Sequence, residues 1–209
     1  MEASAMNAGK AISEAADSGL PAQAVPDWLI PAARAGAAVG ALGSLAGLFA
    51  FRSDETWWML LVNFLFWGGL AQGMVVWAAI LRTAQASWAA GVNRMALTSL
   101  HFLPVTLLMF ALLYVGREHW LTWMHHDLPP AKAKWLNPGF FFARNAAALL
   151  FLTAMSYWYA ALYSKLEVPD GQPVSDASAG LINKVAVGVV GAYVIVYTLL
   201  AFDMVMSLE

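Results

Sequence analysis

The sequence contains no cysteine and little charge. The absence of cysteine among 209 residues excludes disulfides, thiolate-ligated iron–sulfur clusters, CxxC redox motifs and a cysteine nucleophile within this chain. Charged residues make up 11%, against about 25% in soluble domains. A net charge of −2 gives no reason to expect a nucleic-acid partner. So few charges cannot cover the surface of a soluble protein of this size.

Apolar residues dominate instead, at 61% against roughly 45–50% in soluble domains. A bilayer core about 30 Å thick needs roughly 20 mostly apolar residues in a helix. Five stretches meet this requirement: 33–51, 56–81, 95–115, 140–163 and 185–208. They are continuously apolar and do not alternate, which disfavours a β-barrel. The sequence therefore predicts an all-α integral membrane bundle of five transmembrane helices.

Residues 1–32 are rich in alanine and polar residues, and they are predicted to form a polar tail. No basic segment in this tail is followed directly by an apolar core, so a signal peptide is not expected. Basic residues near the helix ends divide six against four between the two sides. The tail side has Lys10, Arg34, Arg82, Arg94, Lys165 and Lys184, and the other side has Arg52, Arg117, Lys132 and Lys134. This bias predicts a cytoplasmic N-terminus.

Polar side chains within the spans are the candidates for function, since each costs free energy in hydrocarbon unless it is paired or hydrated. They are Asn63, Gln72, His101, Arg144, Asn145 and Asp203. Asn63 and Gln72 are nine residues apart, which puts them on opposite faces of one helix. These two residues are therefore not expected to share a site.

His101 lies inside the third span, three residues before Pro104. A haem b would need a second axial ligand on a facing helix, but the remaining histidines lie in the third loop. A neutral, hydrogen-bonded core histidine is therefore the favoured interpretation. Contact with a quinol or a proton is the second.

Arg144 and Asp203 are the strongest candidates. Arg144 lies six residues beyond Pro138, about 9 Å along a helix, from where its long side chain can extend back to the interface. Asp203 has too short a stem to do so, and a carboxyl group buried in a membrane suits proton exchange. Glu209 is a weaker candidate because it can be hydrated.

The aromatic residues and the third loop have simpler interpretations. Tryptophans near predicted helix ends are typical of interfacial belts; they are Trp57, Trp58, Trp120, Trp123 and Trp135. The loop residues His125, His126 and Asp127 could bind a divalent metal, but they lack the spacing of well-formed zinc sites. A contact surface for a peripheral protein partner is favoured there.

Several stretches, taken in order, resemble the NrfD-like membrane proteins of respiratory complexes, most closely the ActF component of alternative complex III. They are 57–66, 87–94 and 101–105, followed by the two most specific stretches, 134–144 and 202–209. The chain resembles the N-terminal half of such a protein, because family members are longer and their Ser-Leu-Glu ending continues. One departure is Leu97, where the family has an acidic residue three positions after the arginine that corresponds to Arg94.

The resemblance implies a membrane component of a quinol:cytochrome c oxidoreductase in the bacterial inner (cytoplasmic) membrane. It implies a proton pathway or quinol-site architecture, with Asp203 carrying protons and Arg144 tuning it or pairing with it. His101 and Glu209 are the other residues expected in the proton pathway or at the quinol site. No redox cofactor is expected in this chain. The implied partners are a second NrfD-like membrane protein, an iron–sulfur protein and multihaem cytochromes c, with the quinone pool and the lipid bilayer nearby.

Two other classes stay open. A structural anchor would dock partners through its aromatic loops and through the glycines of the first span, without chemistry; those glycines are Gly36, Gly40, Gly43 and Gly47. A small transporter is disfavoured, because no symmetric pair of interrupted spans is present in the sequence.

Overall fold

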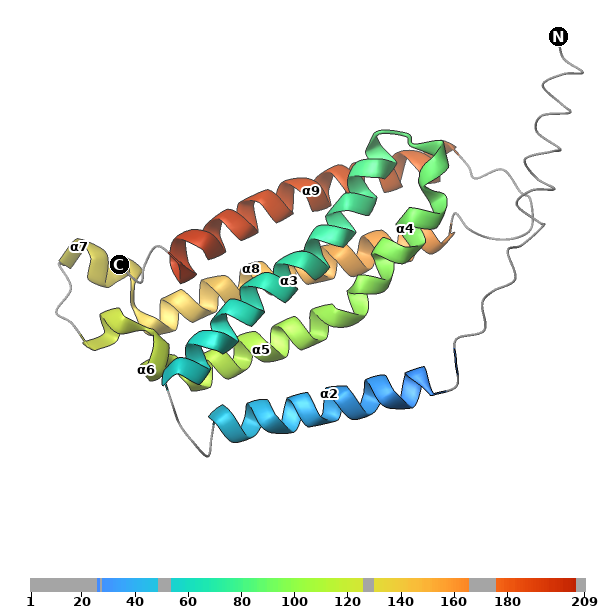
Figure 1. Ribbon diagram of the computed structural model, residues 1–209. Coiled ribbons are helices and arrows are strands. Elements are labelled where there is room, and N and C mark those ends of the chain that lie inside the picture. Colours follow the sequence, from blue (N-terminus) through green and yellow to red (C-terminus); the bar gives the residue numbers. More distant parts are fainter. Residues whose placement is uncertain (1–25, 27, 49–53, 126–129, 166–175, 206–209) are drawn as a thin grey trace, which may run out of the picture. The chain divides into compact units, whose positions relative to one another are not determined.

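The structure is a computed structural model that describes residues 26, 28–48, 54–125, 130–165 and 176–205. All regular elements in these ranges are helical (Figure 1). Five of the described helices are long and apolar enough to cross a membrane. The predicted all-α membrane bundle is therefore confirmed, and the chain is a multi-pass membrane protein in contact with lipid.

The first of two compact units spans 1–52 and contains the helix α2, Leu29–Ala46. This helix begins four residues before the predicted start at position 33. Pro31 lies in its first turn, where the missing backbone N–H has no intrahelical partner to lose. A Cβ added at Gly36, Gly40 or Gly43 would meet nothing within 4 Å. Docking of a partner through these glycines stays a prediction.

The second unit spans 53–209 and contains the other four spans. Its elements are α3 (Asp54–Thr83), η2 (Ser87–Ala89), α4 (Ala90–Leu97), η3 (Thr98–Phe102), α5 (Leu103–Val115), α6 (Arg117–Trp120), η4 (Thr122–His125), α7 (Pro130–Trp135), α8 (Pro138–Ser164) and α9 (Asp176–Met204). Helix α3 packs against α4, α5 and α9, and α8 packs against α9 and α5 (Figure 1). The four spans therefore enclose one core.

The third span consists of α4, η3 and α5 in succession. Pro104 lacks an N–H, so it cannot bond the carbonyl of Leu100 four residues earlier. The hydroxyl of Tyr157 on α8 donates to that carbonyl at 3.0 Å. The Leu100 carbonyl also accepts the backbone N–H of Leu103, so the Tyr157 hydroxyl from a neighbouring span supplies its second hydrogen bond. A carbonyl has two lone pairs and can accept both.

The observed helices extend beyond the predicted spans. Helix α3 is longer by two residues at each end than the predicted 56–81, and α9 begins nine residues before the predicted start at 185. Counting apolar residues detects only the part of a helix inside the hydrocarbon, whereas the helix continues into the polar interface. Residues 206–209, with the candidate Glu209, lie outside the described residues.

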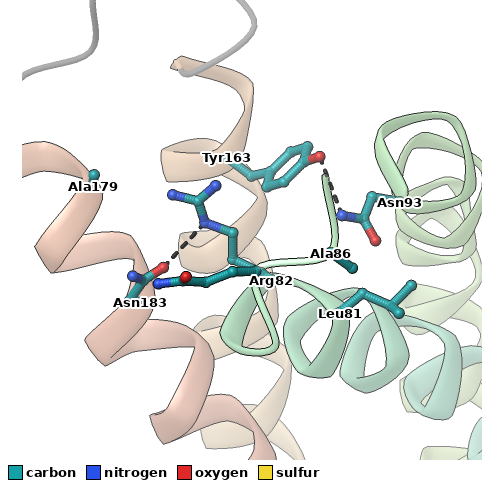
Figure 2. Close-up of a pocket in the computed structure, with 8 residues that line it drawn as sticks. Leu81, Arg82, Ala86, Asn93, Tyr163, Ala179 and Asn183 are labelled. Carbon is teal, nitrogen blue, oxygen red and sulfur yellow. Dashed lines mark hydrogen bonds between the residues drawn. The ribbon is translucent and has the colours of Figure 1, made fainter. Parts of the chain in front are cut away.

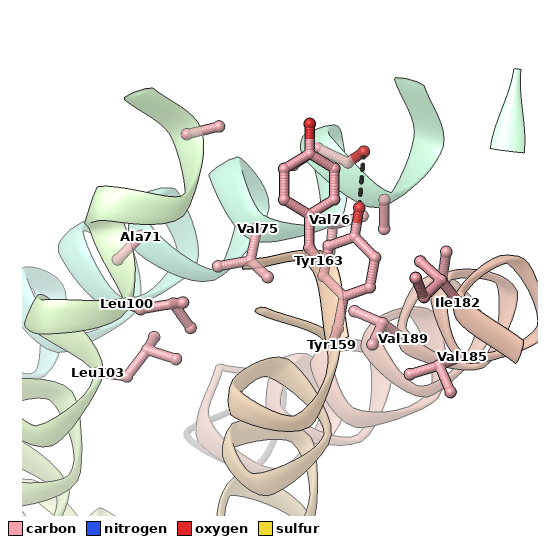
Figure 3. Packing of buried hydrophobic residues seen from close by; sticks show 14 residues of the cluster. Ala71, Val75, Val76, Leu100, Leu103, Tyr159, Tyr163, Ile182, Val185 and Val189 are labelled. Carbon is pink, nitrogen blue, oxygen red and sulfur yellow. Dashed lines mark hydrogen bonds between the residues drawn. The ribbon is translucent and has the colours of Figure 1, made fainter. Parts of the chain in front are cut away.

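The core between α3, α8 and α9 is apolar apart from a few bonded polar groups (Figure 3). Val75, Ala186 and Val189 are fully buried there. The buried hydroxyl of Tyr159 donates to the carbonyl of Ala78 at 3.2 Å. Close packing and a satisfied hydroxyl together fix the three helices against one another.

The predicted tryptophan belt is wrong for Trp57, Trp120 and Trp123, which are buried. The indole of Trp120 donates to the carbonyl of Leu113 at 2.9 Å, and its ring packs against Phe142. The loop after α5 forms the short helices α6 and η4, whose tryptophan rings are covered by the start of α8. Sequence distance from a span cannot reveal this, because it does not show that a loop folds back onto the bundle.

Candidate functional site

Arg144 and Asp203 meet at the end of the bundle where α8 begins and α9 ends. Asn137 caps α8, and its side chain accepts hydrogen bonds from the backbone N–H groups of Gly139 (3.0 Å) and Phe140 (3.3 Å). Pro138 follows at a first-turn position that favours proline. The cap thus fixes where the helix starts, and Arg144 lies six residues further along.

The Arg144 guanidinium binds both oxygens of the Asp203 carboxylate. Its Nε donates to Oδ2 at 2.7 Å and its NH2 group donates to Oδ1 at 2.6 Å. The Asp203 side chain is 1% exposed and that of Arg144 is 10% exposed. This two-point geometry is the strongest arrangement for an arginine–carboxylate pair. Arg144 therefore does not extend back to the interface, which was the alternative that the sequence allowed.

Trp135 from α7 covers the pair. The guanidinium carbon of Arg144 lies 4.0 Å from the centroid of the Trp135 ring, a cation–π contact. The NH1 group of Arg144 donates to the backbone carbonyl of Trp135 at 2.8 Å. The Trp135 indole donates to Asp203 Oδ1 at 3.2 Å. Trp135, assigned from the sequence to an interfacial belt, is therefore part of the site.

Asn145 supplies a further contact from within the bundle. It is completely buried, and its amide nitrogen donates to Asp203 Oδ2 at 2.7 Å and to the Phe141 carbonyl at 2.8 Å. Its Oδ1 atom is buried and has no hydrogen-bond partner among the described residues. An unused acceptor therefore lies beside the ion pair.

Among the described residues, at least four donor groups surround the two carboxylate oxygens of Asp203: two from Arg144, one from Trp135 and one from Asn145. A carboxylate offers about four lone-pair sites in total. A proton can therefore bind Asp203 only if one of these donors is displaced. Exchange of a proton would require movement of Arg144, Trp135 or Asn145.

The structure does not bring His101 into this cluster. His101 lies in η3 with an exposed side chain, and its Nδ1 lies 3.0 Å from the Thr98 carbonyl. The expectation of a core histidine is therefore wrong in its position, although the side chain is hydrogen-bonded. Leu100 and Leu103, on either side of it, are the residues of this segment that turn inward.

The loop histidines have separate partners. Nδ1 of His119 lies 2.8 Å from Asp54 Oδ1, and its ring stacks on Trp57. Nε2 of His125 lies 3.0 Å from the Glu118 carbonyl. The other two residues of the possible metal-binding pattern, 126 and 127, lie outside the described residues.

The expectation that Asn63 and Gln72 lie on opposite faces is confirmed. Gln72 is buried, and its amide nitrogen donates to the Ser156 hydroxyl at 2.6 Å. Asn63 is exposed and donates to the Met59 carbonyl of its own helix. The buried pair joins α3 to α8 at mid-bundle, where an interhelical hydrogen bond stabilises packing in lipid.

A second polar region, which the sequence did not reveal, lies at the opposite ends of α3 and α8. There Arg82 binds Asn183, and a cavity opens beside them (Figure 2). The only sequence signal for it was an arginine near a span end, which is common in membrane proteins. Fold and sites together define a multi-pass helical membrane protein with a buried charge pair.

Comparison with known proteins adds no family assignment. Neither a protein-family model nor a curated protein matches this chain.

Proposed function

We propose that this chain is a membrane component of a quinol:electron-acceptor oxidoreductase of the alternative complex III type. It contributes a proton pathway or quinol-site architecture around Arg144 and Asp203, without a redox cofactor of its own. The observation that carries the proposal is the meeting of the two stretches with the most specific resemblance. Stretch 134–144 supplies Trp135 and Arg144, and stretch 202–209 supplies Asp203. Hydrogen bonds join the three, with the half-exposed Trp135 over a buried ion pair.

Two features of the cluster suit this chemistry. A guanidinium group is a fixed positive charge, so a shift of the Arg144 side chain changes the charge balance around Asp203 and can drive proton uptake. The unused Oδ1 atom of Asn145 is an acceptor suited to a quinol hydroxyl. Haem c and iron–sulfur clusters in partner proteins would carry the electrons, in a bacterial cytoplasmic membrane with the N-terminus inside.

A structural anchor is the second candidate function. The four donors on Asp203 favour it, because a saturated carboxylate is suited to holding α7, α8 and α9 together. In this case the pair fixes the bundle end for docking of partner proteins and transfers no proton.

The variant Asp203→Asn tests the proposal in the assembled complex. It keeps the side-chain shape but removes the charge and the proton-binding group. We expect quinol oxidation per assembled complex to fall by about a hundredfold, in line with the loss of a proton-transfer group. Asn63→Leu, which changes an exposed intramembrane polar residue, is the matched control and should be neutral. Normal quinol oxidation and normal proton translocation in Asp203→Asn would rule out the proton role.

A double variant, Arg144→Met with Asp203→Leu, separates chemistry from anchoring. Replacing both members of a buried ion pair with apolar residues of similar volume is often neutral or stabilising. The proposal therefore predicts an assembled but inactive complex. An assembled and fully active complex would favour the anchor.

Purification from native membranes tests the complex itself. We expect the chain to copurify with proteins that contain haem c and iron–sulfur clusters, detected by absorption and electron paramagnetic resonance spectra. Isolation as a lone homo-oligomer, without such partners, would contradict the proposal.

A further inference from the structure

A cavity of about 430 Å³ lies where α3 and α8 end and α9 begins (Figure 2). Its volume falls within the range of small-ligand sites, roughly 300–1,000 Å³. The lining is Leu81, Arg82, Gln85, Ala86, Asn93, Tyr163, Ala179 and Asn183. Only Arg82 among these residues carries a charge, so the described wall of the cavity is positive.

Most of the N–H donors of Arg82 are not used within the described residues. Its Nε donates to Asn183 Oδ1 at 3.1 Å, which uses one of the five N–H donors of a guanidinium. Within the described part of the chain, no carboxylate bonds to it. Asn183 is neutral, so it orients the arginine without cancelling its charge. The outer N–H groups of Arg82 are available to an anion with paired oxygens.

Asn93 and Tyr163 add a second polar feature. Asn93 is 4% exposed, and its amide nitrogen donates to the Tyr163 hydroxyl at 3.3 Å (Figure 2). Its Oδ1 atom is buried and has no hydrogen-bond partner within the described ranges. Because the Tyr163 oxygen acts as the acceptor here, its own O–H can donate elsewhere. The wall thus offers donors from Arg82 and Tyr163 and an acceptor from Asn93.

The position of the cavity across the membrane indicates the source of the ligand. Arg82 lies one residue before the end of α3, and Tyr163 lies one residue before the end of α8. Helix ends of membrane spans lie at the level of the lipid headgroups. Basic pockets between helices at this level bind anionic headgroups. Lys184, on the neighbouring turn of α9, is exposed and does not line the cavity.

We propose that this cavity binds the phosphodiester of an anionic phospholipid whose headgroup carries a hydroxyl. Arg82 and Tyr163 donate to the phosphate oxygens, and Asn93 Oδ1 accepts from the headgroup hydroxyl. Phosphatidylglycerol has this combination of groups. The site lies at the opposite end of the bundle from Asp203 and does not depend on the proposed function.

Native mass spectrometry of the purified, delipidated protein tests this. Phosphatidylglycerol, phosphatidylcholine and inorganic phosphate are added back separately to the wild type and to Arg82→Gln, Arg82→Lys and Lys184→Gln. We expect phosphatidylglycerol to be retained in preference to phosphatidylcholine. The preference should fall about tenfold in Arg82→Gln and less in Arg82→Lys, because a lysine keeps the charge without the planar fork. Lys184→Gln, which removes a nearby charge outside the cavity, should keep the preference.

Three results would overturn the proposal: equal retention of phosphatidylglycerol by the wild type and Arg82→Gln, equal retention of the two lipids by the wild type, or an equal loss in Lys184→Gln. Displacement of phosphatidylglycerol by inorganic phosphate at matched concentration would assign the site to free phosphate instead. If Arg82→Gln fails to fold, the comparison is made with Arg82→Lys, since lysine preserves a cation at this position.

Discussion

Each end of the bundle contains a partly buried arginine, and the two arginines have different kinds of partner. Arg144 is bound by the buried carboxylate of Asp203 and covered by Trp135. Arg82 is bound by the neutral Asn183 and borders an open cavity. The first arginine is neutralised and enclosed within the protein, whereas the second keeps its charge for a ligand.

The difference shows that the partner decides what an intramembrane arginine can do. A carboxylate partner removes the net charge, and the low dielectric then makes loss of either member costly. An amide partner orients the guanidinium and leaves its charge in place. The pair at the Asp203 end is therefore expected to control stability and the proposed chemistry, and Arg82 is expected to control ligand binding.

The largest expected effect on stability comes from replacing the arginine at each end of the bundle with alanine. Arg144→Ala leaves Asp203 buried without its cation, and we expect a loss of about 3–5 kcal/mol in the free energy of unfolding. Arg82→Ala loses one hydrogen bond to an amide, and we expect about 0.5–1.5 kcal/mol. Unfolding in mixed detergent micelles measures both. Equal losses would mean that the two arginines do not differ as the structure indicates.

The next largest effect is expected from adding a methyl group to a glycine at each end of the bundle. A Cβ on Gly116, which follows α5, would overlap the ring of the buried Trp57, so Gly116→Ala should cost about 1–3 kcal/mol of stability. A Cβ on Gly180, beside the cavity lining, would meet nothing within 4 Å. Gly180→Ala should be neutral or stabilising, because alanine favours the helix. Thermal unfolding of both variants gives the comparison, and a tolerated Gly116→Ala would contradict the close packing.

The smallest effect concerns the two ends of α8. Asn137→Ala removes the acceptor for two backbone N–H groups at the Arg144 end, and we expect a loss of about 1 kcal/mol. Ser164→Ala, at the other end of the same helix, removes one exposed bond to the Ala161 carbonyl and should change nothing measurable. Thermal unfolding measures the pair. If Asn137→Ala had unchanged thermal stability, Pro138 alone would fix the start of the helix.

Much of the fold followed from composition. The number of spans and their approximate centres are consequences of apolar run length, and the opposite faces of Asn63 and Gln72 follow from helical periodicity. The start of α9 could not be predicted from composition, since its first turns are polar and carry no hydropathy signal. The burial of Trp57, Trp120 and Trp123 did not follow either, because it depends on segments distant in the sequence. Trp57 stacks on His119 of α6, and the rings of Trp120 and Trp123 pack on Phe141 of α8.

The candidate site was predicted in part. Arg144, Asn145 and Asp203 attract attention as polar residues in apolar runs, but the sequence separation of 59 between Arg144 and Asp203 conceals their contact. His101 has the same sequence signal and lies on an exposed face. A single polar residue in a span is therefore a candidate, and only its neighbours on other helices distinguish a site from a surface.

The sequence by itself determined that this chain crosses a membrane as an all-α bundle, because scarce charge and long apolar runs leave few other stable forms. The tertiary structure alone decided which polar groups meet. It joined Arg144 to Asp203 and left Arg82 facing a cavity, although both arginines lie near the end of a span. The physical reason is that pairing of buried charges depends on distances of a few ångströms between helices, and helix packing sets these distances.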